Sequence, residues 1–371
     1  MRPGSRPGRD RYLDLWRAAA ILRVVAFHAT GWAWLNLAFP AMGLMFGIAG
    51  SLMAASADRY GHRAVVRRMR RFLVPLWVYA AVTVAVLVAA GWSIPDLGPA
   101  ALVWWVVPAR VPPTGGPAWA WAFNVGLWYL VTYFWLVLLS PLLLRLFRRW
   151  PWPCLAVATV LPLPYLFAPA ASGYFVATYL SCWLLGFAHH DGLLRRLPAR
   201  ACVAAIAGLA VAGGGGLLVA ARAGSGFDPT ATPGAWTLWS MAFVAAVLRF
   251  RPRAGQHGRR ARGGFADRAA GLVNARAVTI YLWHIPGGVL IAGLLVPVLT
   301  GDPLVGEVLR ALGPAAAIAV AVPLLGWVED LAGGRRRAPA PAPAGSAPAG
   351  PAATPCAAST GRSSRRAAVR R

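Results

Sequence analysis

Stretches of about twenty mostly apolar residues recur along the chain, separated by short polar segments. A helix of that length crosses the hydrocarbon core of a bilayer. Strands that cross a membrane would need alternating polarity, which the sequence does not have. The pattern therefore predicts an all-α, polytopic transmembrane helical bundle of about ten spans.

The spans can be placed from the apolar runs. We place them at residues 13–34, 38–56, 72–92, 122–144, 152–169, 171–189, 201–221, 232–249, 276–298 and 304–328. The apolar segment 99–109 is too short to cross a membrane. We expect it to be an interfacial or re-entrant piece.

Composition supports a membrane protein. Of the 371 residues, 58% are hydrophobic and 13% are charged, and the mean hydropathy is +0.57. A soluble domain of this length would carry more charge. The cysteines are scattered, with no spacing typical of a disulfide framework or a metal site, and we expect no metal.

The arginines predict the topology. The net charge is +26, every basic residue is arginine, and cytoplasmic loops of membrane proteins are enriched in such residues. With a cytoplasmic N-terminus, all but five arginines fall in cytoplasmic segments. The exceptions are Arg17 and Arg23 in the first span, and Arg110, Arg222 and Arg310 near the outer face. We therefore expect a multi-pass protein of the inner (plasma) membrane with both termini cytoplasmic.

The positions of the arginines also argue against nucleic-acid binding and indicate where the domains begin and end. A nucleic-acid partner is not expected, because the basic residues line one membrane face and no soluble domain presents them. We divide the chain into a basic N-terminal tail (1–12), a transmembrane domain (13–330) and a tail (331–371). This last segment is rich in Pro, Ala, Gly, Ser and Arg, and we expect it to be disordered and cytoplasmic.

Two residues of the first span suggest chemistry. Charged groups inside a span are costly unless they are paired or hydrated, so they are candidates for function. Arg17 and His28 are eleven residues apart, which places them on one helix face, ~16 Å apart along the axis. Asp14 precedes Arg17 by about one turn, which is a spacing that allows the two side chains to pair. His28 lies too deep in the predicted span to reach the interface, whereas Arg17 alone could snorkel. Arg23 lies on another face, and the sequence predicts no role for it.

Two further elements carry polar side chains near or within spans. His284, in the segment Tyr281-Leu282-Trp283-His284, either forms a hydrogen bond between helices or contacts a substrate. The run Arg67-Arg68-Met69-Arg70-Arg71 precedes the third span. Such a cluster either anchors the topology or binds an anionic, phosphate-bearing donor, because the arginine fork pairs bidentately with phosphate.

Together these elements resemble the acyltransferase-3 family of integral membrane O-acyltransferases. The resemblance covers about residues 10–330. It rests on Leu13-Asp14 with Arg17 and His28 (Arg-x10-His), Phe46-Gly47-Ile48-Ala49-Gly50-Ser51, the arginine cluster ending in Pro75, Leu127-Trp128-Tyr129-Leu130, and Tyr281-Leu282-Trp283-His284. Two departures are Ala49-Gly50-Ser51, where Ser-Gly-aromatic is more usual, and Arg23 in a normally apolar run.

The resemblance implies transfer of an acyl group, often acetyl, from acyl-CoA to a hydroxyl of a glycan or glycosylated metabolite. Acyl-CoA would be a co-substrate, and no cofactor would be bound. His28 would be the catalytic histidine and Arg17 its essential partner. The remaining roles would be donor binding by Arg68 or Arg71, and substrate binding or support by Asp14, His284, Tyr281 and Glu329.

We expect His28 to act as a general base on the acceptor hydroxyl, with a transient acyl-histidine as the less favoured route. Two other function classes remain open. A transporter would use the intramembrane arginine and histidine as a proton or anion relay. A membrane scaffold would use the histidines only to tie helices together.

Overall fold

The computed structural model describes residues 10–92, 98, 100–166, 173–225, 232–250, 264–299 and 302–334. Within these ranges every regular element is a helix, so the predicted all-α class is confirmed. The expected disordered tail (331–371) lies outside the described residues from 335 onward, and its first two residues, Leu331 and Ala332, belong to the last helix. The elements, in chain order, are α1 (Arg11–Thr30), α2 (Trp34–Ala38), α3 (Ala41–Tyr60), α4 (Arg63–Ala89), α5 (Ala100–Val106), η2 (Ala118–Phe123), α6 (Trp128–Arg149), α7 (Pro151–Val160), η3 (Leu163–Leu166), α8 (Tyr174–His190), α9 (Leu193–Arg196), α10 (Ala199–Ala220), η4 (Ala221–Ser225), α11 (Pro233–Arg249), α12 (Phe265–Ala275), α13 (Ala277–Leu299), α14 (Pro303–Leu325) and α15 (Trp327–Ala332).

The chain is a multi-pass membrane protein. Among the described residues, six helical segments are long and apolar enough to cross a bilayer: Trp34–Tyr60, Arg63–Ala89, Ala118–Arg149, Ala199–Gly224, Ala277–Val296 and Leu304–Leu325. Of the other predicted spans, α1 is long enough but carries several charges, and α8 and α11 have 17 residues each. The total of ten spans remains a prediction.

One predicted span is interrupted. The apolar run 152–169 is helical in α7 only as far as Val160, and the short 3-10 helix η3 follows. Pro162 and Pro164 explain the break, because proline lacks the backbone N–H that a continuing helix needs. The apolar run at 99–109, by contrast, contains the short helix α5, and its interfacial or re-entrant placement stays a prediction.

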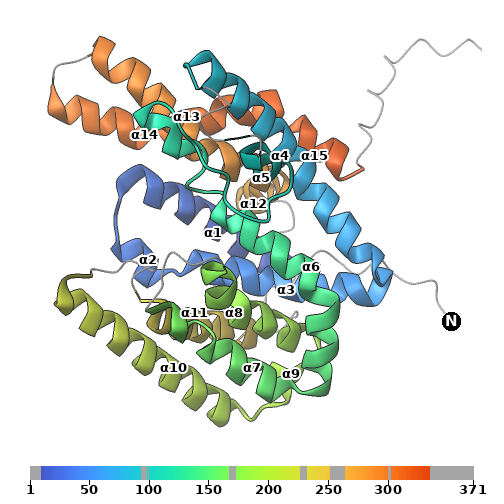
Figure 1. Cartoon of the computed structure of the whole chain (residues 1–371). Helices are drawn as coiled ribbons and strands as arrows, with labels where there is room; N and C mark the ends of the chain where they lie inside the picture. The colour runs from blue at the N-terminus through green and yellow to red at the C-terminus, as the bar shows by residue number, and fades with distance from the viewer. Residues whose placement is uncertain are drawn as a thin grey trace, which may run out of the picture. The chain divides into compact units, whose positions relative to one another are not determined.

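The ends of the long helices separate into two sides. In Figure 1 the connections α3–α4, α6–α7 and α8–α10 lie on the right, and the connections α1–α2 and α13–α14 lie on the left. Arg63, Arg149 and Arg196 belong to the right-hand connections, so we call this the arginine-rich side. The cytoplasmic location of this side stays a prediction.

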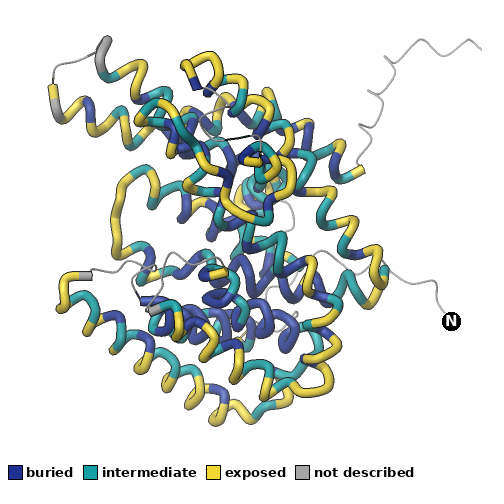
Figure 2. The backbone as a smooth tube through the Cα atoms, viewed as in Figure 1, coloured by how far each residue is buried: buried dark blue, intermediate teal, exposed yellow. Residues whose placement is uncertain are grey.

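The core lies around α3, α8 and α11, where the tube in Figure 2 is mostly buried. α10 is as apolar as a core helix, yet only 17% of its most apolar stretch is buried. Val211 and Val219, for example, are 75% and 68% exposed. An apolar helix with exposed apolar side chains fits contact with lipid, since monomeric soluble proteins rarely expose such extended apolar surface.

Glycines allow α3 and α8 to pack backbone to backbone. A methyl group added to Gly186 of α8 would overlap the Gly47 carbonyl oxygen and lie 2.5 Å from the Ser51 nitrogen, both in α3. One added to Gly50 would overlap the Trp183 carbonyl oxygen. The motif Phe46 to Ser51 therefore includes glycines that set the distance between these two helices.

We expect Gly186→Ala to destabilise the protein by about 1–3 kcal/mol or more, because the clash is with backbone that cannot move aside. Gly215→Ala, in α10, is the matched control. Nothing lies near the added methyl there, so replacing a helical glycine should be neutral or stabilising by up to about 1 kcal/mol. Thermal unfolding of the detergent-solubilised protein measures both. Equal melting temperatures for the two variants would contradict the packing argument.

Candidate active site

The two intramembrane histidines of the sequence meet in the structure. His28 lies in the last turn of α1 and His284 lies in α13, and their ring centroids are 4.9 Å apart. Nδ1 of His28 is 3.1 Å from Nε2 of His284. A hydrogen bond between rings that are 256 positions apart in the chain makes this pair the centre of the candidate site.

The hydrogen-bond partners fix the tautomers of both neutral rings. Nδ1 of His284 faces the carbonyl oxygens of Tyr281 at 2.7 Å and Ile280 at 3.2 Å, so it carries the hydrogen. Nε2 of His284 is then an acceptor, and Nδ1–H of His28 is the donor to it. The Val24 carbonyl oxygen, 2.9 Å from the same His28 nitrogen, also accepts. Nε2 of His28 therefore keeps its lone pair and can accept a proton.

His28 is more accessible than the sequence predicted. We expected it deep inside a span that reached residue 34, but its side chain is exposed at the end of the helix. The reason is Gly31, which adopts a left-handed conformation (φ 68°) and ends α1 at Thr30. No described residue forms a hydrogen bond with Nε2 of His28, so this nitrogen is open to an incoming molecule.

Arg17 lies on the same helix, toward the arginine-rich side. It is half-buried, and no hydrogen bond or ion pair joins it to another described residue. Asp14 and Arg17 form no ion pair with each other in the structure, and the Asp14 carbonyl oxygen accepts a hydrogen bond from Nδ2 of Asn274. An unpaired, half-buried guanidinium is suited to binding an anion.

Arg68 and Arg71, both in α4, differ in their surroundings. Arg68 is half-buried and donates hydrogen bonds to Ser56 Oγ at 3.0 Å and to the Tyr133 hydroxyl at 3.5 Å, and its Nε is buried without a partner. Arg71 is exposed and has no hydrogen bond or ion pair among the described residues. Arg68 is therefore held facing the interior, whereas Arg71 is free to move.

Aromatic rings connect Tyr133 to the histidine pair. The ring centroids of Tyr133 and Tyr129 are 6.3 Å apart, and those of Tyr129 and Tyr281 are 5.0 Å apart. Tyr281 and His284 follow at 5.8 Å, and His284 then contacts His28. We call these five rings the aromatic column. With Arg68 at one end and His28 at the other, the column links the two sides of the protein.

Two further candidate residues support this arrangement from different places. The Tyr281 hydroxyl donates a hydrogen bond to the Gly126 carbonyl oxygen at 2.7 Å, which fixes the ring that leads to His284. Glu329 of α15 accepts hydrogen bonds from the backbone N–H and the hydroxyl of Thr279 at 2.8 and 2.6 Å. Glu329 thus anchors the start of α13 and does not touch the histidine pair.

Burial raises the pKa of the Glu329 carboxyl, in spite of the hydrogen bonds from Thr279 and the nearby Arg276 charge. The folded state therefore holds the proton more tightly than the unfolded state. Glu329 contributes most to stability below its unfolded pKa, and this contribution is lost as pH rises through the folded pKa. We expect the melting temperature of Glu329→Gln relative to wild type to increase as pH rises from 4 to 8. A difference that does not change with pH would contradict this.

Arg23 has a structural role that the sequence did not predict. It is buried, and Nε donates to the Leu35 carbonyl oxygen at 3.1 Å while Nη2 donates to the Asn36 side-chain oxygen. Its guanidinium also lies 5.3 Å from the centre of the Phe27 ring. Arg23 thus fixes α2 against α1. Gly31 was the feature of the sequence that could have indicated this role. The turn that it forms folds the next helix back toward Arg23.

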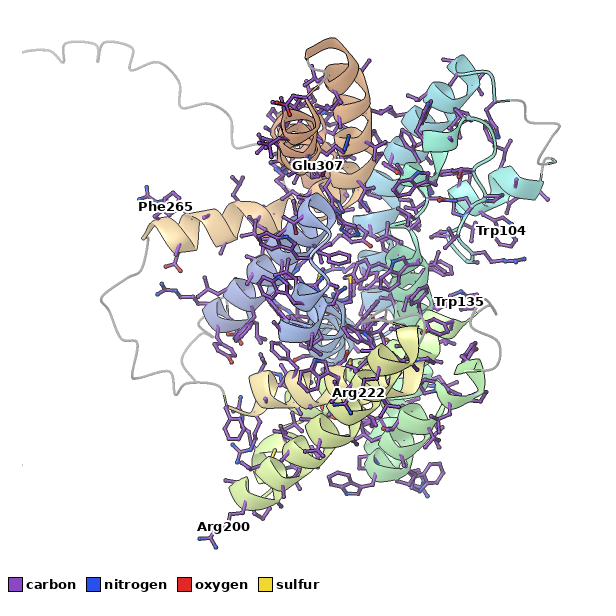
Figure 3. The ribbon with its side chains drawn as sticks, turned by 90° about the vertical axis from the view of Figure 1, so that its left-hand side faces the viewer. Trp104, Trp135, Arg200, Arg222, Phe265 and Glu307 are labelled. Carbon is purple, nitrogen blue, oxygen red and sulfur yellow. The ribbon has the colours of Figure 1, made fainter. Side chains whose placement is uncertain are left out.

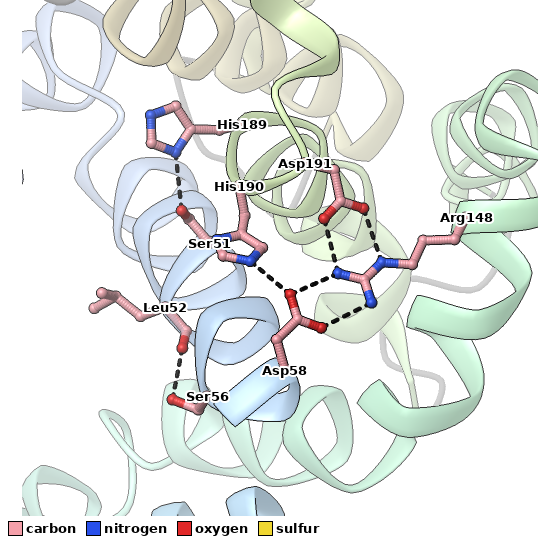
Figure 4. Close-up of polar contacts among 8 residues, drawn as sticks. All are labelled: Ser51, Leu52, Ser56, Asp58, Arg148, His189, His190 and Asp191. Carbon is pink, nitrogen blue, oxygen red and sulfur yellow. Dashed lines mark hydrogen bonds and ion pairs between the residues drawn. The ribbon is translucent and has the colours of Figure 1, made fainter. Parts of the chain in front are cut away.

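A second polar cluster joins α3, α6 and α8 at the arginine-rich side (Figure 4). Arg148 donates two hydrogen bonds each to Asp58 (2.8 and 2.9 Å) and Asp191 (2.8 and 3.0 Å), and His190 Nε2 lies 2.8 Å from Asp58. The Asp58, His190 and Asp191 ligand atoms are close enough together to hold a metal ion. Arg148 already pairs with both carboxylates, so we interpret the cluster as an ion-pair network that ties the helix ends together.

One comparison with known proteins gives a match. A family model described as an acyltransferase domain matches residues 10–328. No curated protein and no solved structure matches the chain. The matched range contains the histidine pair, Arg17 and the arginines of α4, and among the candidate residues only Glu329 falls just beyond it.

Proposed function

Because the chain belongs to the acyltransferase 3 family and is a membrane acyltransferase, we propose that it transfers an acyl group, with acetyl the first choice, from acyl-CoA to a hydroxyl. The acceptor is a glycan or a glycosylated metabolite. The observation that carries the proposal is the hydrogen bond between His284 and His28, which leaves Nε2 of His28 as an exposed acceptor. A general base needs such a free acceptor nitrogen within reach of the hydroxyl proton.

In the proposed reaction, Nε2 of His28 takes the proton of the acceptor hydroxyl as its oxygen attacks the thioester carbonyl. The carbon–sulfur bond then breaks, the ester forms, and CoA leaves as a thiolate that receives the proton from His28. His284 accepts a hydrogen bond from Nδ1–H of His28 throughout, which keeps the ring oriented and favours the charged form. His284 is thus a positioning residue.

The donor is proposed to enter from the arginine-rich side, which we take as cytoplasmic. Arg68 and Arg71 bind its phosphates, because guanidinium groups pair with phosphate in a bidentate manner. Arg17 lies further along the same route and stabilises negative charge on the donor or the tetrahedral intermediate. The cavity beside Tyr281 and Ile285 has a volume of about 10 Å³, which holds about one water. This cavity is therefore too small to hold an acyl chain.

The main alternative is a transporter that uses the arginine and histidine residues as a relay. Purified protein in proteoliposomes distinguishes the two. Supplied with acetyl-CoA and candidate glycans, an acyltransferase releases free CoA in proportion to the ester formed. Movement of substrate across the vesicle membrane without release of CoA would overturn the proposal and favour the transporter.

A further inference from the structure

A large cavity lies away from the histidine pair. Its volume is about 830 Å³, within the range of ligand sites, and it is lined by residues of α5, the 109–111 segment, α6, Leu161, Tyr165 and the start of α8. α6 contributes residues with helical spacing, which therefore share one face: Trp128, Val131, Thr132, Trp135 and Leu139. Tyr129 and Tyr133 of the aromatic column project about 100° or more around the same helix. The cavity and the candidate active site therefore lie on different faces of α6.

The segment that covers the cavity is held firmly. The indole N–H of Trp77 donates to the Val106 carbonyl oxygen at 2.8 Å, and that of Trp135 donates to the Ala109 carbonyl oxygen at 2.9 Å. Nδ2 of Asn124 donates to the Pro112 carbonyl oxygen at 3.0 Å. These bonds place Arg110, which lies between the last two anchors, at the edge of the cavity.

The chemistry of the lining favours an amphiphile over a sugar. Among the described lining residues Arg110 is the one that is charged; it is exposed, stacks 5.9 Å from the Trp104 ring, and forms no ion pair with a described residue. The Thr132 hydroxyl and the Trp135 indole N–H already donate to carbonyl oxygens of the protein. The other polar groups of the lining residues are the Tyr165 and Tyr174 hydroxyls and the indole N–H groups of Trp104 and Trp128. A sugar needs many hydrogen bonds, whereas these few groups stand at the edges of large apolar rings.

The cavity also faces the surroundings of the bundle. Figure 3 views the protein from the side opposite the arginine-rich one, and places Trp104 and Trp135 at the right-hand edge of the helices. Leu139 and Val111, which also line the cavity, are exposed. The edge of a transmembrane bundle is where lipid chains contact the protein.

We propose that this cavity binds a membrane phospholipid, with its hydrocarbon chain against α6 and its phosphate on Arg110. Burying methylene groups against the aromatic lining provides the apolar part of the affinity. The guanidinium provides the headgroup part through charge-assisted hydrogen bonds. The site is independent of acyl transfer, because none of its residues belongs to the aromatic column.

The test is photo-crosslinking in nanodiscs with a phosphatidylglycerol that carries a diazirine in its acyl chain. We expect labelling of α6 between Trp128 and Leu139. Arg110→Gln should reduce the apparent affinity for the probe about fivefold, the effect of about 1 kcal/mol from one basic residue at the membrane surface. Arg222→Gln is the matched control, since Arg222 is another exposed arginine at the same side and does not line the cavity.

Two further experiments separate binding of the hydrocarbon chain from binding of the phosphate. Ala177→Trp fills the cavity and should remove labelling of α6, and its melting temperature reports whether it folds. If it does not fold, the role of the phosphate is tested by Arg110→Gln and by a second probe, a diazirine diacylglycerol. This probe has no phosphate, and its apparent affinity should be about fivefold lower. Equal labelling by both probes, an equal effect of Arg110→Gln and Arg222→Gln, or protection by a soluble oligosaccharide would overturn the proposal.

Discussion

His28→Ala is expected to reduce kcat by about 10²- to 10⁴-fold, the range lost when a general base is removed. The variant should still insert and fold, because the His28 side chain is exposed and the helix around it is held by Gly31 and by Arg23. Release of free CoA from acetyl-CoA, measured with an acceptor present, gives the rate. Thermal unfolding of the same sample gives the folding control.

Substitutions of His284 test whether the hydrogen bond to His28 matters for catalysis. His284→Gln can still accept a hydrogen bond from Nδ1–H of His28, whereas His284→Phe cannot. We therefore expect His284→Gln to keep more of kcat than His284→Phe, with little change in the KM for acyl-CoA in either. Loss of the His284 acceptor should also shift the pH profile of kcat, which a purely structural role would not do. Full activity of His28→Ala would remove the proposed mechanism.

The sequence predicted individual elements of this site better than their contacts. The Arg17–His28 spacing is a local property of one helix, so the shared face followed from helix geometry. The contact between His28 and His284 depends on how α1 packs against α13, and a single sequence holds no signal for a pair so far apart. The same limit hid the aromatic column, whose tyrosines come from α6 and α13.

Two differences did have local signals. Gly31 ends α1 early and exposes His28, and a glycine after a periodic run is a typical helix stop. Pro162 and Pro164 break the predicted span 152–169 in the same way. In both cases the predicted helix was too long, because its end was placed from hydrophobicity and the glycine or proline stop signal was not used. The role of Arg23 needed the tertiary fold, because Leu35 and Asn36 reach it only after the chain turns back.

Arg68→Ala is expected to raise the KM for acetyl-CoA by about tenfold to a hundredfold. This is the effect of losing a hydrogen bond to a charged group, which contributes about 1.5–3 kcal/mol to binding. Arg71→Ala should raise it by about fivefold at most, since Arg71 is exposed and solvent screens its charge. Arg67→Ala is the control, because Arg67 is exposed and stacks 4.0 Å from the centre of the Tyr60 ring.

The donor itself tests which part of it Arg68 binds. Acetyl-pantetheine keeps the thioester but lacks the phosphates of acetyl-CoA. If Arg68 binds phosphate, wild type should use acetyl-pantetheine poorly, and Arg68→Ala should lose nothing further with it. If Arg68 only braces Ser56 and Tyr133, the variant should lose activity equally with both donors. Equal losses would therefore place donor binding elsewhere, and Arg17, the unpaired guanidinium nearer the histidine pair, would be the next residue to substitute.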